Sequence, residues 1–478
     1  MPILLILLLF SLPAWADGTL TIPDIGNSAD SSLSLKEEQR LGGQFMRQTR
    51  GNVDLLDDPE IEAYIQSLGE QLVSYLDEAP YRYTFFVVNS AQINAFAVPG
   101  GYIGINAGLI IAADNESELA SVLAHEIAHV SQRHISRSIE GSSGANLATI
   151  ASILAAIALS SQGGDASLAA LSVGMAAGQQ SRINYTRTHE KEADRIGIHL
   201  LAGAQYDPQG MARFFEKLHK ESRYYQTGLP EILMTHPVTL NRISDAKNRA
   251  AQYSQRGQEG IADKPAFQYF RAKVRVLNSI KQQQLEQQTR TLFNQHPLPE
   301  LAYQLALLEN HNGKAAQAEM RLRKLIQQQG EHSWLTLALA ESLQRQQKNN
   351  QALTLYKQAL LIYPGNKALT LNYAEQLLKQ NAADEAFNLL KVYLRTHHQL
   401  TPRVYQLYAQ AASRLGNRVD SSSALAEYFY LRGQSIVAVQ HLEEAIKAAK
   451  DQPYRLPKLQ QRRDEIKKIA LGEQSEKH

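Results

Sequence analysis

The sequence contains no cysteine in its 478 residues. This absence excludes disulfide scaffolds, zinc sites built from thiolates, cysteine nucleophiles, covalently attached haem and a lipidated N-terminal cysteine. An excess of charge of one sign is also lacking, since 49 Lys and Arg face 47 Asp and Glu. With 44% hydrophobic and 20% charged residues, the composition is that of a folded protein rather than a disordered or collagen-like chain, and the length predicts two or three domains.

The first sixteen residues lack charged side chains. They contain the apolar run Ile3–Phe10 and end in an AWA tripeptide, which has small residues at the −3 and −1 positions of a cleavage site. This pattern predicts a secretory signal peptide at 1–16, although the usual Lys or Arg after Met1 is missing. A retained anchor or a buried N-terminal helix is the alternative, but the run is shorter than the roughly 20 residues that span a bilayer. We therefore expect an exported, periplasmic protein without disulfide chemistry.

The near-neutral total charge conceals two unlike halves. Residues 17–264 contain 20 Lys and Arg against 29 Asp and Glu, a net charge of −9, whereas the remainder has a net charge of +11. The polar, glycine-containing segment SQRGQEG at 254–260 lies at the change of sign and reads as a linker. We therefore predict one domain over 17–260 and a second over 265–470.

The second half repeats with a period of 34 residues. Successive units share small or large apolar residues at equivalent positions: Leu305, Leu339, Tyr373 and Leu407, then Ala306, Ala340 and Ala374, then Ala318, Ala352 and Ala386, then Leu322, Tyr356 and Leu390. Plain helix packing would also place Leu and Ala at helical spacing, but three consecutive matches at one period favour a repeat. The pattern resembles tetratricopeptide repeats, which implies a helical solenoid with a groove for extended peptides or protein partners. Nucleic acid in a basic groove is the alternative, and the predicted export argues against it.

An HExxH motif lies in the first half, within a segment of helical periodicity over 116–137. His125 and His129 are four residues apart on one helical face, so both imidazoles can reach one ion, and Glu126 lies beside the water that such an ion would hold. The alternative is an exposed amphipathic helix that carries these residues without a metal. With 14 histidines, the pattern is expected by chance on the order of a few times in a hundred such chains.

A catalytic zinc of this kind needs a third protein ligand and an open position for water. The second predicted helix, at about 184–203, offers Glu190 and Asp194 one turn apart on one face, with Ala193 small enough for close packing. Glu192 is rotated by roughly 200° from Glu190 and should point elsewhere. Glu190 is therefore the candidate ligand, and Asp194 could bind a liganding histidine or lie near the substrate oxyanion. Without the histidine motif, an ordinary charged helix would be the preferred interpretation.

Three further histidines need an interpretation. His236, held on a loop by the following proline, could donate a hydrogen bond to the tetrahedral oxyanion, or take the open metal position and hold the enzyme latent. A surface histidine is the alternative for His236. His134 and His189 are predicted to be structural or surface residues.

The stretch 141–181 has a single charged residue, Asp165. Its apolar core is short for a membrane span, so two packed helices are favoured over a mobile flap or a membrane contact.

These motifs resemble the HtpX/CAAX-prenyl-endopeptidase family of zinc metallopeptidases. The resemblance covers about residues 36–250 and rests on HEIAH at 125–129, on ExxAD at 190–194, and on NAFAVPGGYI at 94–103, a strand and turn that precede the active-site helix in that family. The resemblance implies one Zn²⁺ per chain, with His125, His129 and Glu190 as its ligands. It also implies that Glu126 is the catalytic base and that Asp194 is a proton donor.

With the export signal and the repeats, the architecture is similar to the periplasmic branch of that family that serves outer-membrane β-barrel assembly. It implies a mainly α fold, in which a zincin metallopeptidase domain with a small β-sheet precedes a tetratricopeptide-repeat solenoid. It also implies an endopeptidase that degrades unfolded or misassembled outer-membrane proteins, acts as a chaperone, and contacts the β-barrel assembly machinery through its repeats. The alternative is a non-catalytic chaperone with a latent zinc site. A membrane-embedded prenyl-type endopeptidase is disfavoured because no convincing span is present. Substrate could lie as an added strand along residues 94–105.

Overall fold

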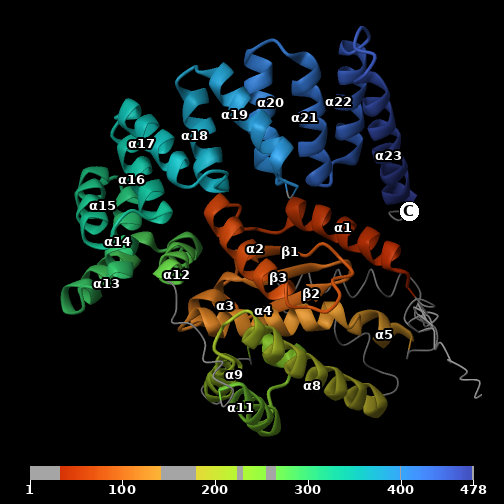
Figure 1. Cartoon of the computed structure of the whole chain (residues 1–478), viewed down its shortest axis with the longest axis vertical. Coiled ribbons are helices and arrows are strands. Elements are labelled where there is room, and N and C mark those ends of the chain that lie inside the picture. Colours follow the sequence, from red (N-terminus) through yellow and green to blue (C-terminus); the bar gives the residue numbers. More distant parts are fainter. Residues whose placement is uncertain (1–32, 141–178, 223–229, 255–264, 399, 476–478) are drawn as a thin grey trace, which may run out of the picture.

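The computed structural model describes residues 33–140, 179–222, 230–254, 265–398 and 400–475 (Figure 1). The predicted signal peptide, most of the 141–181 stretch and most of the predicted linker lie outside these residues. Within them the chain is mainly helical, with a three-stranded sheet in its first half and helical repeats in its second, so the predicted fold class is confirmed. None of the described helices is both long and apolar enough to cross a membrane.

The first half consists of α1 (Leu35–Asn52), α2 (Pro59–Val73), β1 (Thr84–Val88), β2 (Ala95–Val98), β3 (Tyr102–Asn106), α3 (Ala107–Ala112), α4 (Glu116–Ser131), α5 (His134–Glu140), α8 (Gln179–Gly203), α9 (Gln209–Ser222), α10 (Glu231–Thr235) and α11 (Leu240–Ser254). The sheet order is β1-β3-β2, with β3 parallel to β1 and antiparallel to β2. Because β2 lies at one end of this order, it is an edge of the sheet that the described residues form, and it lies within the strand and turn predicted over 94–103.

The turn between β2 and β3 depends on two glycines. Gly100 and Gly101 have φ values of +82° and +90°, a region that residues with a side chain rarely adopt. A Cβ on Gly100 would lie 2.6 Å from the carbonyl oxygen of Glu38 in α1. The turn is therefore packed directly against α1, which ties the sheet to the first helix.

The second half consists of α12 (Pro265–Asn278), α13 (Gln282–Gln295), α14 (Pro299–His311), α15 (Ala315–Gln329), α16 (Ser333–Arg345), α17 (Asn349–Ile362), α18 (Lys367–Lys379), α19 (Ala383–Thr396), α20 (Pro402–Arg414), α21 (Arg418–Leu431), α22 (Ser435–Ala448) and α23 (Leu456–Ser475). Most residues of the 34-residue pattern are buried between these helices, and Ala318, Ala352 and Ala386 are fully buried. In Figure 1 the repeats form an arc that passes from α13 over the first half to α23.

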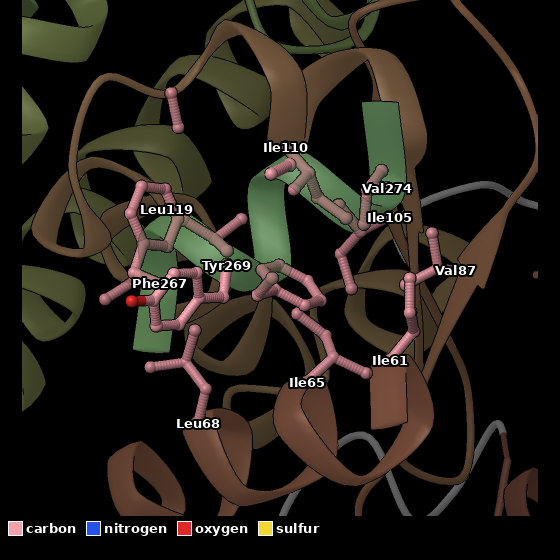
Figure 2. Packing of buried hydrophobic residues seen from close by; sticks show 14 of the residues in the cluster. Ile61, Ile65, Leu68, Val87, Ile105, Ile110, Leu119, Phe267, Tyr269 and Val274 are labelled. Atoms are coloured by element: carbon pink, nitrogen blue, oxygen red, sulfur yellow. The ribbon is translucent and has the colours of Figure 1, made fainter. Parts of the chain in front are cut away.

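Helix α12 is part of the hydrophobic core of the first half. Figure 2 shows Phe267, Tyr269 and Val274 of α12 among side chains of α2, β1, β3, α3 and α4. The aromatic ring of Phe270 stacks on that of Tyr64 in α2, with ring centroids 4.2 Å apart. The two halves therefore share one continuous core, and the predicted domain start at residue 265 stays a prediction.

A second contact joins α1 and α2 to the later repeats. The ammonium group of Lys367 in α18 forms an ion pair with Glu62 of α2. The guanidinium of Arg47 in α1 donates a hydrogen bond of 3.2 Å to the hydroxyl of Tyr430 in α21 and also lies over its ring. The arc of repeats is thus attached to the first half at its start, through α12, and again near its end.

Candidate metal centre

Two histidines of α4 point toward one position. The Nε2 atoms of His125 and His129 lie 3.1 Å apart. The helix begins where the side chain of Asn115 accepts a hydrogen bond from the N–H of Glu118, and acidic residues in its first turn suit the positive end of the helix dipole. Nearly all residues of α4 are buried, so its neighbours fix its rotation and thereby the direction of both imidazoles.

The third predicted ligand comes from α8. Oε1 of Glu190 lies 3.3 Å from Nε2 of His129, and Oε2 lies 3.4 Å from Nε2 of His125. The two helices approach closely because Ala193 is fully buried and because a Cβ on Gly197 would lie 3.3 Å from backbone atoms of α4. The structure brings the three predicted ligands together, and their role as ligands stays a prediction.

His236 also lies in this cluster rather than on an open surface. It follows α10 directly, and its backbone N–H donates to the carbonyl oxygen of Ile232. Its Nδ1 atom is 2.9 Å from Oε1 of Glu190 and 3.4 Å from Nε2 of His125. The donor atoms of His125, His129, Glu190 and His236 all lie within 4.8 Å of one another.

The carboxylate of Glu126 is buried beside the cluster. Its Oε1 atom has no hydrogen-bond partner among the described residues, and Nε2 of His236 lies 3.6 Å away. Buried polar atoms are nearly always hydrogen-bonded in native proteins, so this oxygen faces a position where a bound water would satisfy it.

Asp194 lies next to His125, on the side of the ring that faces away from the cluster. Of the two positions predicted for Asp194, this is the one beside a candidate ligand histidine. Its Oδ1 atom is 3.0 Å from Nδ1 of His125. Arg242 of α11 donates to both oxygens of Asp194 at 2.8 Å and reaches Oε2 of Glu190 at 2.8 Å. This carboxylate accepts from a guanidinium on one side and lies against an imidazole nitrogen on the other, which is the arrangement of a residue that orients His125, and its role as a proton donor stays a prediction.

His134 lies behind His129 in the same manner. Its Nδ1 atom is 2.9 Å from Nδ1 of His129, and its Nε2 atom is 3.1 Å from Oε2 of Glu192. Glu192 therefore points away from the cluster, and Arg137 also binds its carboxylate. The ring of His189 stacks on that of His134, with centroids 4.1 Å apart, and both histidines are buried.

Arg242 lies just downstream of the His236–Pro237 motif, but the sequence assigned it no role and did not indicate the contact of His134 with His129. Glu190 and Asp194 are one turn apart, and two such carboxylates require a cation nearby when they are buried. The sequence therefore indicates that a cation is needed, but not which of the 49 Lys and Arg residues supplies it.

The charges of the cluster depend on one another. Burial alone would raise the pKa of Glu190, but the neighbouring imidazoles, with His236 first among them, hold it well below its usual value. Burial alone would lower the pKa of His125, but hydrogen bonds to Asp194 and Glu190 raise it. Burial lowers the pKa of His129, so this imidazole stays neutral. These shifts correspond to the ionised carboxylate of Glu190 and the neutral imidazole of His129 that a metal ion requires.

The donor set fits a zinc ion. Imidazole nitrogens and a carboxylate oxygen are usual zinc ligands, and catalytic zinc sites have three protein ligands with a further position for water or substrate. Both imidazoles of α4 have a partner at the ring nitrogen that faces away from the cluster, Asp194 for His125 and His134 for His129. Such partners are the rule for metal-binding histidines.

Comparison with known proteins places this site in a family. The family model Peptidase family M48 matches residues 59–250, which include the whole cluster, and a tetratricopeptide repeat model matches residues 343–411. The beta-barrel assembly-enhancing protease of Escherichia coli (strain K12) is 35% identical over 441 residues, which cover 91% of this chain and 88% of that protein. The putative beta-barrel assembly-enhancing protease of Vibrio cholerae is 34% identical over 442 residues, covering 91% and 90%. The mitochondrial metalloendopeptidase OMA1 of Bos taurus is 34% identical over 166 residues, covering 33% and 30%.

Proposed function

Because this chain belongs to the family of β-barrel assembly-enhancing proteases, with an M48 peptidase domain and tetratricopeptide repeats, we propose that it is a zinc-dependent endopeptidase of the HExxH-plus-glutamate type. The observation that carries the proposal is the convergence of His125, His129 and Glu190 beside the unpartnered carboxylate oxygen of Glu126. The ligands are on two helices packed against each other, α4 and α8, so their spacing is set before a metal binds.

Each residue then has one task in peptide hydrolysis. A zinc ion held by His125, His129 and Glu190 would supply electrophilic activation of the scissile carbonyl and lower the pKa of a water. Glu126 takes a proton from the attacking water and passes it to the leaving amine. Asp194 orients the ring of His125 through Nδ1, and its ion pair with Arg242 keeps this carboxylate ionised.

The topology supports substrate binding along β2. β2 is an edge of the sheet, and it packs against α4, which carries both histidines. An extended peptide that adds to this edge would make main-chain hydrogen bonds and lie beside the metal centre.

Two roles for His236 make opposite predictions. Its position among the four donor atoms supports the role of an additional ligand that holds the enzyme latent. His236→Ala should then raise peptidase activity, because the position becomes open to water and substrate. If His236 instead donates a hydrogen bond to the oxyanion, the same change should lower kcat by about 10²–10³-fold.

Glu126→Gln tests the catalytic proposal. The amide keeps the shape of the side chain but cannot accept the proton, so cleavage of an unfolded protein substrate should fall to background while metal content stays at one zinc per chain. Metal content is measured by elemental analysis of the purified protein, and removal of zinc by a chelator should abolish the activity of the wild type. Normal cleavage by Glu126→Gln would refute the mechanism.

The wider role is proposed by similarity to the assembly-enhancing proteases. We place the protein in the periplasm, where it would assist outer-membrane β-barrel assembly as a chaperone, degrade misassembled β-barrel proteins, and bind the assembly machinery through the repeats. The alternative is a non-catalytic assembly factor with a latent site, which the position of His236 favours. Complementation of an assembly-defective strain separates the two, because rescue by Glu126→Gln supports the assembly factor and loss of rescue supports the enzyme.

A further inference from the structure

A cavity of about 640 Å³ lies between α1 and the later repeats, and none of its lining residues belongs to the metal cluster. Its walls come from α1, from β1 and from α18, α21 and α23. Its volume falls within the range of about 300–1,000 Å³ typical of ligand sites. This space is therefore a candidate binding site that the peptidase activity does not use.

The lining of the cavity is strongly basic. Six cations face two carboxylates, Asp57 and Glu62. The cations are Arg40, Arg47, Arg50, Arg82, Lys367 and Lys468. One carboxylate, Glu62, is already paired with Lys367. The excess of positive charge selects an anionic ligand.

Arg50 is the central feature of this lining. Its guanidinium is partly buried, and it makes no hydrogen bond or ion pair with any residue in the described part of the chain. Burial lowers its pKa, whereas electrostatic interactions with Glu62, Asp57 and Tyr102 raise it. A half-buried cation without a hydrogen-bond partner is unfavourable, and a carboxylate bound beside it would remove that penalty.

The shape of the site favours an extended ligand over a small ion. A second cavity of about 470 Å³ shares Asp57, Glu62 and Thr401 with the first and continues along α18, α20 and α21. The side chains of Tyr102, Leu431 and Ile469 line the first cavity together with the cations. A groove lined by both charged and apolar side chains matches a peptide rather than a single phosphate.

We propose that this groove binds an extended acidic peptide segment of another protein, with a carboxylate of that segment paired to Arg50. The site is separate from the proposed active site, so the proposal does not rest on catalysis. Binding places the partner between the first half of the chain and the repeats, where it contacts α1 and α21 together.

The test measures binding of a labelled peptide to the full chain by fluorescence anisotropy. The probe alternates glutamate with leucine, and its counterpart carries glutamine in place of glutamate. We expect the glutamate peptide to bind more tightly by about tenfold or more, because each charge-assisted hydrogen bond is lost in the counterpart. Mass spectrometry checks that the peptide stays intact.

Variants locate the binding. Arg50→Met should weaken binding of the glutamate peptide by about tenfold, and Lys468→Met should weaken it less, since Lys468 is exposed. Arg249→Met is the matched control, since Arg249 is exposed on α11 and does not line the groove. It should leave binding unchanged.

Thermal unfolding supplies a second readout. Because Arg50 has no described partner, Arg50→Met should unfold at the same temperature as the wild type or a higher one. Added glutamate peptide should raise the melting temperature of the wild type more than that of the variant.

Several results would overturn the proposal. Equal binding of the glutamine peptide, or unchanged binding to a folded Arg50→Met variant, would do so. Equal weakening by Arg249→Met would show non-specific attraction. Phosphatidylglycerol vesicles that bind through Arg50, when the peptide does not bind, would assign the groove to a lipid surface instead.

Discussion

His134 and His129 lie with their Nδ1 atoms 2.9 Å apart, and this contact settles how the second metal-site histidine is held. With Nε2 of His129 bound to the proposed metal, its Nδ1 would carry the proton and donate to Nδ1 of His134. His134 then carries its own proton on Nε2 and donates it to Glu192, 3.1 Å away. One chain of hydrogen bonds would thereby fix the tautomers of both rings, and we infer that His134 is a positioning residue for the proposed metal site.

The first prediction concerns His134. Replacing it with alanine removes the acceptor behind His129, and we expect zinc affinity to fall by about 10–100-fold. Zinc affinity is measured by competition with a chelator, which reports on the site without an activity assay. His199→Ala is the control, since His199 is exposed on the same helix α8 and should leave affinity unchanged. Unchanged zinc affinity in His134→Ala would mean that packing alone orients His129.

The second prediction concerns Arg242. Only 5% of Arg242 and 6% of Asp194 is exposed, so Arg242→Leu leaves two buried carboxylates without their cation. We expect the free energy of unfolding to fall by about 3–5 kcal/mol. The measurement is urea unfolding of the metal-free protein. Adding Asp194→Asn to this variant should recover part of the loss, because one of the unpaired charges is removed. A double variant that loses the full sum of both single effects would contradict this coupling.

How far the fold and the site could be predicted depends on how far apart in the sequence the interacting residues are. His125, His129 and Glu190 could be predicted because a helix fixes which side chains share a face. The 34-residue repeat could be predicted because each unit buries the same small and apolar positions.

Contacts between distant segments could not be predicted in this way. The helical periodicity of apolar residues in α12 would be the same whether this helix packed on the repeats or on α2. The sequence therefore could not show that α12 enters the core of the first half. Arg242 reaches Asp194 only because α11 packs against α8 and α9. Such packing decides which charged residue pairs with which. The chain contains too many charged residues for these ion pairs to be assigned from their spacing in the sequence.

The third prediction concerns pH and the junction between the two halves. Lys273 of α12 pairs with Asp58 at 2.8 Å and Glu60 at 2.6 Å, both at the start of α2. Burial raises the pKa of Glu60 to about 8, since the single charge of Lys273 cannot balance two carboxylates. The folded state therefore holds a proton on Glu60 that the unfolded state releases from about pH 4.5 upward.

Stability should consequently fall as pH rises from about 4.5 to about 8, by up to about 1.4 kcal/mol per pH unit from this residue. Glu60→Gln, which is neutral at every pH, should flatten this part of the profile. The free energy of unfolding is measured by urea titration across the interval in both proteins. Parallel profiles for wild type and Glu60→Gln would show that Glu60 does not titrate there.

The fourth prediction concerns the closest approach of the two metal-site helices. A Cβ on Gly197 would lie 2.9 Å from the terminal methyl of Met211 and 3.3 Å from the backbone N of His125. The methionine can move aside, but the backbone of α4 moves only together with His125. Gly197→Ala should therefore displace α8 by a few tenths of an ångström and separate Glu190 from the histidines.

We expect zinc affinity to fall in Gly197→Ala, and the usual gain of about 1 kcal/mol for alanine over glycine within a helix to be absent. Gly472→Ala on α23 is the matched control, because a Cβ there meets nothing within 4 Å. That variant should keep full zinc affinity. Gly197→Ala with raised stability and unchanged affinity would mean that α4 and α8 have room for a methyl group. The spacing of the ligands would then be set by the metal rather than by the packing of the two helices.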